Sequence, residues 1–224
     1  MSSYCADPFS AFKMNDMSKI ILAIESAILG GSISLQKNGR EIANWIGSSN
    51  VSKADDLLAN IDAILNENKI SRHKVDMIAV SAGPGSFTGI RIGIATALGL
   101  KSGLRIEMST ESALKAMAYE MADIKPVITA VPAGRNSVCL QTFQNHAGDV
   151  AALDAPRTLA DDDFFEFVST EKTTTFVLHE SLYKKFASSP TITNFGANIA
   201  YAIGKICLQN PGAVTSPLFI SKSV

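Results

Sequence analysis

Two residue types that commonly build reactive sites are scarce in this chain. Its three cysteines, Cys5, Cys139 and Cys207, lie far apart and form no C-x-x-C pair. This spacing excludes a zinc or dithiol motif and is typical of reduced thiols, so we expect a cytoplasmic protein. The three histidines are equally scattered and form no H-E-x-x-H pair. The sequence therefore predicts no metal site and disfavours a metal-dependent enzyme.

Long hydrophobic runs and an excess of charge of one sign are also missing. The most apolar stretch, Ile92 to Leu100, is far shorter than the ~20 residues of a membrane span. Residues 1–18 lack the apolar run of a secretory signal and are interpreted as a loose tail. With 20 basic and 21 acidic residues the net charge is −1, whereas nucleic-acid binders normally carry a basic excess. We expect no membrane contact, and RNA contact only through a partner.

The composition that remains is globular, with 46% hydrophobic and 18% charged residues over 224 positions. At ~150 residues per domain, this length allows between one and two domains. Three runs near the start, Ile20–Glu25, Ser32–Lys37 and Arg40–Ile46, predict antiparallel strands. The last two are joined by Asn38-Gly39, and an Asn-Gly pair between alternating runs is a strong hairpin signal.

Helical and strand patterns then alternate along the chain. After a helix over 53–67, the nearly all-apolar run Val75–Ala82 predicts a strand covered on both faces. Further elements are a helix at about 88–102, a strand near 105–108 and a helix at about 110–121. A similar order restarts with strands at 125–131, 137–143 and 150–153, a helix at about 159–168, a strand at 173–179 and a helix at about 197–208. Two copies of one topology predict a first lobe over 19–122 and a smaller second lobe over 123–224.

The segment from Gly83 to Lys101 is the most informative. Gly89, Gly93 and Ala97 recur every four residues on one face of the helix that follows the glycine turn. Glycine inside a helix costs about 0.5–1 kcal/mol relative to alanine, so a bare face indicates a close neighbour. That neighbour is either the chain's own sheet or a helix of another subunit. The second interpretation predicts that a bulky residue at Gly93 abolishes partner binding and leaves the fold largely intact.

The glycine loop does not match the common nucleotide-binding motifs. It lacks the Lys-Ser/Thr pair of a P-loop and the third glycine of G-x-G-x-x-G. Amides at a helix start still attract anions, so a weak nucleotide site is considered at Glu25, Ser26, Gly85 and Ser86. A ribonuclease-H-like nuclease would need an acid where the fourth strand ends in Ser81-Ala82. An actin-like ATPase would need a second phosphate turn where the chain reads 131–135. No catalytic residue is assigned.

Three segments of the chain resemble the TsaB (YeaZ) family, whose members are bacterial partners in making the tRNA base threonylcarbamoyladenosine. These segments are ILAIESA, DDLLANIDAILNENKI and VDMIAVSAGPGSFTGIRIGIATALGLK. The resemblance covers about Ile20 to Met121 and is weak afterwards, although the terminal SPLFISKSV looks like the family's closing strand. It implies an α/β fold of the actin-like (ASKHA) kind, a pair of ribonuclease-H-like lobes with mixed sheets flanked by helices. It also implies kinship with the catalytic subunit TsaD without that subunit's metal-binding histidines.

The resemblance further implies a non-catalytic partner subunit. Such a subunit supports TsaD in tRNA threonylcarbamoyladenosine formation, is joined by the ATPase TsaE, and forms a homodimer when alone. The alternatives are an independent actin-like nucleotide-binding enzyme, a glycoprotease-like hydrolase, or a homodimeric regulator unconnected to tRNA. No cofactor is expected, with ATP or ADP at the subunit junction as the alternative.

In this family the two helices flanking the glycine loop form the dimer surface. The residues that the resemblance assigns to a partner interface are Asp55, Leu58, Ile61, Asp62, Leu65, Thr88, Gly89, Arg91, Ile92, Gly93, Ala95, Thr96, Ala97, Gly99 and Leu100.

The chain departs from the family pattern at three places. Glu25-Ser26-Ala27 stands where many members have Asp-Thr-Ser, and Lys53-Ala54 replaces a His-Ser pair. The Asp-Ala-Arg of the second half is Pro132-Ala133-Arg135, with Gly134 inserted. These changes remove polar groups that could hold a nucleotide, so they weaken the ATPase interpretation.

Overall fold

The computed structural model describes residues 18–48, 53–121, 126–134, 136–146, 148–187 and 191–219, with 53–56 described by their backbone alone. Apart from Ser18, the predicted tail over 1–18 lies outside the described residues. So does the predicted lobe boundary at 122/123. Within the described ranges, no helix is both long and apolar enough to cross a bilayer.

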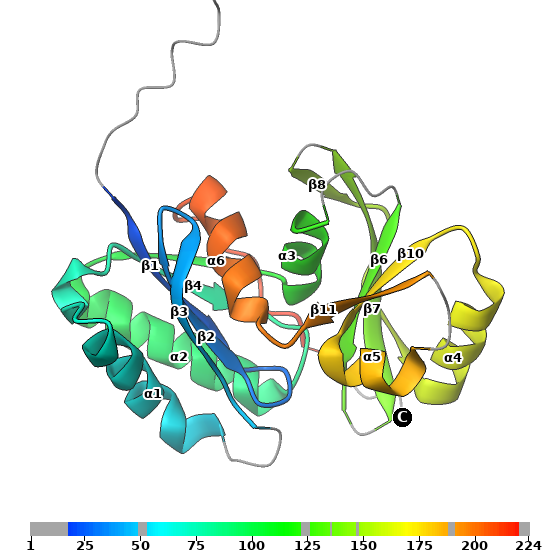
Figure 1. The fold of residues 1–224 in the computed structure, drawn as a ribbon, viewed down its shortest axis with the longest axis horizontal. Coiled ribbons are helices and arrows are strands. Elements are labelled where there is room, and N and C mark those ends of the chain that lie inside the picture. Colours follow the sequence, from blue (N-terminus) through cyan, green and yellow to red (C-terminus); the bar gives the residue numbers. More distant parts are fainter. Residues whose placement is uncertain are drawn as a thin grey trace, which may run out of the picture.

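The first sheet has five strands in the order β3-β2-β1-β4-β5 (Figure 1). β1 (Ile20–Glu25), β2 (Ser32–Lys37) and β3 (Arg40–Ile46) are antiparallel, whereas β4 (Met77–Ser81) and β5 (Glu107–Glu111) run parallel to β1. The predicted hairpin at Asn38-Gly39 is confirmed, and both residues have positive φ, 54° and 74°. This is the conformation that an Asn-Gly turn favours.

The second sheet repeats this plan in the order β11-β10-β6-β7-β8, and β9 also pairs with β7. β6 is antiparallel to β7 and parallel to β10, as β1 is to β2 and β4. The strands are β6 (Val127–Pro132), β7 (Ser137–His146), β8 (Asp149–Ala152), β9 (Arg157–Ala160), β10 (Thr175–His179) and β11 (Ile192–Gly196).

Both sheets are covered by helices on two faces. α1 (Lys53–Glu67) and α2 (Phe87–Leu104) cover the outer face of the first sheet, and α4 (Asp161–Thr170) and α5 (Glu180–Phe186) cover that of the second (Figure 1). Between the sheets lie α3 (Ala113–Tyr119) and α6 (Ile199–Gln209). Alternate residues of β1 therefore enter different cores, since the side chains of a strand point to opposite faces.

The first half follows the predicted elements closely, and the second half less so. The strand expected at 105–108 lies at β5 instead, because Arg105 adopts a left-handed conformation that ends α2. The helix expected from residue 159 begins at Asp161, because the residues before it pair with β7 as β9. α5, β11 and a 3₁₀ turn at Arg72–Lys74 were not predicted.

The two described cysteines are buried, which gives a testable consequence. Burial raises the pKa of the thiols of Cys139 and Cys207 to about 12. Because the thiolate is the nucleophile, neither thiol should react with a thiol reagent at pH 8 while the chain is folded. Mass spectrometry of a Cys5→Ser variant should show no modification without denaturant and two modifications in 6 M guanidinium. Fast labelling in native buffer would contradict this packing.

Candidate partner-binding surface

The turn after β1 is built by Glu25, which is only 2% exposed. Its Oε1 accepts hydrogen bonds from the backbone N–H groups of Ala27 (2.6 Å) and Ile28 (2.9 Å). A carboxylate that accepts from two turn amides satisfies donors that would otherwise be buried without partners. Glu25 therefore has a structural role in this turn.

The glycine loop after β4 is fastened to that turn by backbone contacts. The N–H of Ser86 donates to the carbonyl of Ala27 (2.7 Å), and a Cβ at Gly85 would lie 2.5 Å from the same oxygen. The hydroxyl of Ser86 accepts from the N–H of Gly89 and caps α2. Glu25, Ser26, Gly85 and Ser86 thus do lie together, and their contacts connect the two turns. Nucleotide binding there remains the alternative hypothesis, since no cofactor is expected.

The small-residue face of α2 points into the protein. A Cβ at Gly89 would lie 2.2 Å from the carbonyl oxygen of Ser26, and one at Gly93 would lie 2.3 Å from the Ser26 hydroxyl. That hydroxyl donates to the carbonyl of Gly89 (2.9 Å), and Ala97 is fully buried. The predictions that this face receives a second chain, and that a bulky residue at Gly93 leaves the fold intact, are therefore wrong. α2 crosses the turn after β1 so closely that side chains have no room.

Two further residues assigned to the interface also face inward. Ile61 and Leu65 of α1 are 2% and 4% exposed and belong to the core between α1, α2 and the first sheet. They therefore cannot contact a partner unless α1 moves. The side chain of Asp55 lies outside the described part of the chain.

The other predicted residues form an outward face on the same two helices, here called the α1–α2 surface. Leu58 is 56% exposed, and Ile92, Thr96 and Leu100 are half-buried. One more leucine, Leu98, is 47% exposed and was missed, although it follows Ala95 at helical spacing. The exposed members of the surface are Leu58, Asp62, Thr88, Arg91, Ala95, Leu98 and Gly99.

The C-terminal segment adds an aromatic ring next to this surface. The N–H of Leu218 donates to the carbonyl of Ala82 (2.8 Å), and Phe219 bridges to Gly85. The ring of Phe219 lies 4.9 Å from that of Phe87, and the guanidinium of Arg91 lies 3.7 Å from the centre of the Phe87 ring. Both rings are nearly half exposed. Phe219 was expected in a closing strand, and in the described part it forms this isolated bridge.

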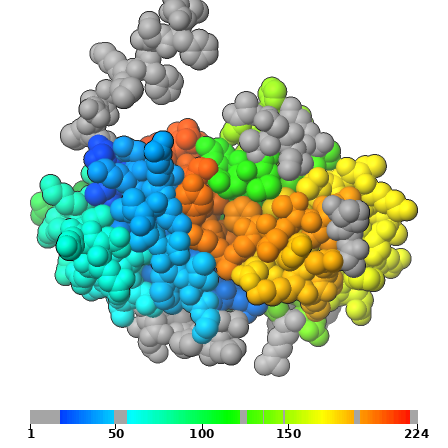
Figure 2. All heavy atoms as spheres, viewed as in Figure 1, coloured from blue at the N-terminus to red at the C-terminus, as the bar shows by residue number. Residues whose placement is uncertain are grey.

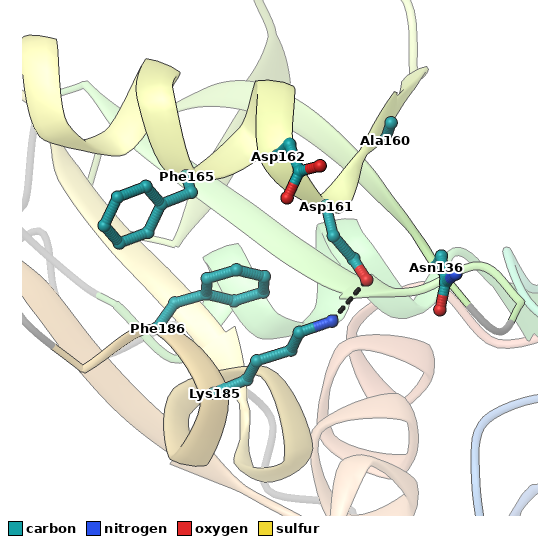
Figure 3. A pocket seen from close by; sticks show the side chains of 7 residues that line it. All are labelled: Asn136, Ala160, Asp161, Asp162, Phe165, Lys185 and Phe186. Atoms are coloured by element: carbon teal, nitrogen blue, oxygen red, sulfur yellow. Dashed lines mark hydrogen bonds and ion pairs between the residues drawn. The ribbon is translucent and has the colours of Figure 1, made fainter.

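A hollow of about 560 Å³ lies on the second lobe, away from the α1–α2 surface. Figure 3 shows the side chain of Lys185 in α5 reaching Asp161 at the start of α4, and the rings of Phe165 and Phe186 lie to one side of this ion pair. Two of the charged groups that line the hollow are thus already paired with each other. Among the described residues, no three His, Cys, Asp or Glu side chains gather as metal ligands would.

A family model described as TsaD, tRNA N6-adenosine threonylcarbamoyltransferase, matches residues 52–210, which is more than half of the chain. The chain belongs to the TsaD family. The family model begins just before α1 and extends to the end of α6, so it includes β4 and β5 of the first sheet, the whole second sheet and the whole α1–α2 surface.

Curated relatives carry the name tRNA threonylcarbamoyladenosine biosynthesis protein TsaB. The Buchnera aphidicola (subsp. Baizongia pistaciae) protein is 32% identical over 126 residues, 54% of this chain and 57% of that protein. The Haemophilus influenzae protein is 32% identical over 122 residues, 53% and 51% of the two chains. The chain thus spans about half the length of these relatives. The predicted resemblance to the TsaB (YeaZ) proteins is confirmed.

A crystal structure from Pseudomonas aeruginosa, of an uncharacterized protein with similarity to peptidase YeaZ, superposes with a TM-score of 0.67. The identity is 20%, and the match covers 91% of this chain and 100% of that chain. At this identity the likeness concerns the fold. The expected actin-like pair of lobes with mixed sheets flanked by helices is confirmed.

Two glycines of α2 make a matched test of the inward face. Gly89→Ala should lower the free energy of unfolding by about 1–3 kcal/mol, because its Cβ would overlap the backbone of Ser26. Gly99→Ala meets no atom within 4 Å and should raise it by about 0.5–1 kcal/mol, because alanine is the better helix former. Urea denaturation measures both. Equal effects of the two substitutions would show that Gly89 is not closely packed.

Proposed function

We propose that this chain is a non-catalytic partner subunit of a TsaD-like paralogue in the formation of threonylcarbamoyladenosine in tRNA. The name shared by the TsaB relatives supports the pathway. The α1–α2 surface supports the mode of action, which is contact with another protein chain. In this proposal a TsaE-like ATPase joins the assembly. The chain contacts tRNA only as part of that assembly, which works in the cytoplasm.

The observation that carries the proposal is a pair of exposed leucines on packed helices. Leu58 of α1 and Leu98 of α2 are about half exposed, and the small residues Ala95 and Gly99 lie beside Leu98 on α2. Small residues allow a partner helix to approach to the short end of the ~8–10 Å packing range. Burying a leucine fully contributes about 1.5–3 kcal/mol, so covering these two would favour association.

Charge on the same surface supports a homodimer when no paralogue is present. Asp62 on α1 and Arg91 on α2 are both exposed and carry opposite charges. In a two-fold dimer the same surface meets itself, so an acid on one helix can face a base on the other copy. Such pairs favour one orientation and contribute little affinity at an exposed rim.

A non-catalytic role is supported by the polar side chains at the ends of β1 and β4, which are hydrogen-bonded within the fold. At the end of β4, where a ribonuclease-H-like nuclease would need an acid, the hydroxyl of Ser81 accepts from the N–H of Gly83 (3.1 Å). At the end of β1, Glu25 accepts from turn amides, and Ser26 donates to α2. Both positions are used by the fold itself.

A pull-down with matched leucine variants tests the proposal. Leu58→Asp should reduce capture of the TsaD-like paralogue at least tenfold, because a charge would be buried in the contact. Leu153→Asp is the control, since Leu153 of the second lobe is 54% exposed and lies far along the chain from α1 and α2. Equal capture of both variants would remove the α1–α2 surface from the proposal.

The alternative, an independent nucleotide-dependent enzyme, predicts a different result with ATP. Because the polar groups of Glu25, Ser26 and Ser86 hold the two turns together, we expect calorimetry with ATP and Mg²⁺ to show no binding in the micromolar range. Micromolar binding with hydrolysis by the isolated chain would favour the alternative. Reconstituted tRNA modification, with and without the chain, separates a regulator unconnected to tRNA from the proposed subunit.

A further inference from the structure

Each inner helix is bonded to the sheet of the opposite half of the sequence. α3 follows β5 of the first sheet, yet it packs on β6, β7 and β8. Thr129 of β6 donates to the carbonyl of Leu114 (2.9 Å), and the buried amide of Asn145 in β7 donates to the carbonyl of Ala118 (2.8 Å). The end of α3 is thus fixed to the second sheet.

α6 makes the reverse crossing. It follows β11 of the second sheet and packs on β1, β2, β4 and β5. Its first turn is held by Ser32, which accepts from the N–H of Ala200 (3.0 Å), and by Gln36, which donates to the carbonyl of Tyr201 (2.9 Å). A Cβ at Gly204 would lie 2.1 Å from Nε2 of Gln36. α6 is therefore seated on the first sheet too closely for a side chain at that position.

The two inner helices are also joined to each other. Lys205 of α6 donates to Glu120 at the end of α3 (2.9 Å), and its Nζ lies 5.2 Å from the ring of Tyr201 and 5.9 Å from that of Tyr119. Beneath this pair one buried apolar cluster runs from β1 and β4 through α3 and α6 to β6 and β7. Figure 2 shows the atoms of α6, in orange, next to the β2–β3 hairpin, in blue.

We infer that the two lobes form one rigid, cooperatively folded unit that does not open and close. A hinge motion would have to slide α3 along α6 and open a core that both sheets share. Close-packed interiors resist such deformation, and a large apolar contact between domains suppresses their relative motion. The α1–α2 surface is then held in a fixed orientation to the second lobe. This inference does not depend on the proposed partner.

Unfolding monitored separately in each lobe tests the inference. Trp45 of β3 is the chain's one tryptophan and packs against the core of the first lobe. A dye on Glu166→Cys, exposed on α4, reports the second lobe in a Cys5→Ser background. In urea, both signals should change at the same midpoint. Midpoints that differ by more than the error would overturn the inference.

A core substitution in one lobe sharpens this test. Phe164 lies in a cluster made only of second-lobe residues. Phe164→Leu should lower the urea midpoint of the Trp45 signal as much as that of the dye signal. If this variant fails to fold, Val168→Ala takes its place in the experiment. Ile61→Val in the first-lobe core is the mirror control, and it should lower the dye midpoint equally. If Phe164→Leu left the urea midpoint of the Trp45 signal unchanged, the lobes would be shown to unfold independently.

Rigidity itself is measured as a distance between spin labels. Labels at Glu67→Cys on α1 and Glu166→Cys on α4, both exposed, span the two lobes. One narrow distance distribution, unchanged by ATP and Mg²⁺, is expected. A broad or double distribution, or a shift of the peak with nucleotide, would overturn the inference and would leave the pull-down result for the α1–α2 surface unaffected.

Discussion

The contact on which the first lobe depends is the very close packing of two backbone segments, where α2 crosses the turn after β1. Gly89 lies against the carbonyl of Ser26, and the hydroxyl of Ser26 returns a hydrogen bond to Gly89. A helix seated this closely has its rotation about its own axis fixed. That rotation decides which residues of α2 face outward, and so places Arg91 and Leu98 on the surface. The inward glycines and the outward leucine are two results of one constraint.

The sequence predicted the first lobe well because its signals there are local. Asn38-Gly39 fixes a hairpin, and the apolar run ending at Ser81 fixes a central strand, whatever lies around them. α5 and β11 were missed because they are short and have weak periodic patterns. The N-terminal cap of α5 is a histidine rather than a serine or aspartate, and β11 is held mainly by its pairing with β10. Pairing between distant segments is not visible in one sequence.

The candidate site shows a different limit of sequence reasoning. A stripe of small residues reports that something comes close, and it does not report whether that neighbour belongs to the same chain. Gly89 and Gly93 lie against Ser26 in the turn after β1 of the same chain, so the residues chosen for their smallness were the inward ones. Leu58, chosen from the family resemblance, lies on the outward face. Phe219 could not be placed beforehand, because a single bridge to Gly85 brings it next to α2.

The two lobes share a plan, and each contributes one helix to the other lobe. In each lobe an antiparallel hairpin precedes two parallel strands, and one helix leaves to pack on the other lobe's sheet. This exchange places α3 and α6 side by side and merges two cores into one. A fold whose halves could move apart is suited to enclosing a ligand between them. Here the ion pair of Lys205 with Glu120 and the shared core favour a body that presents fixed surfaces, which is what the proposed role as a partner subunit would require.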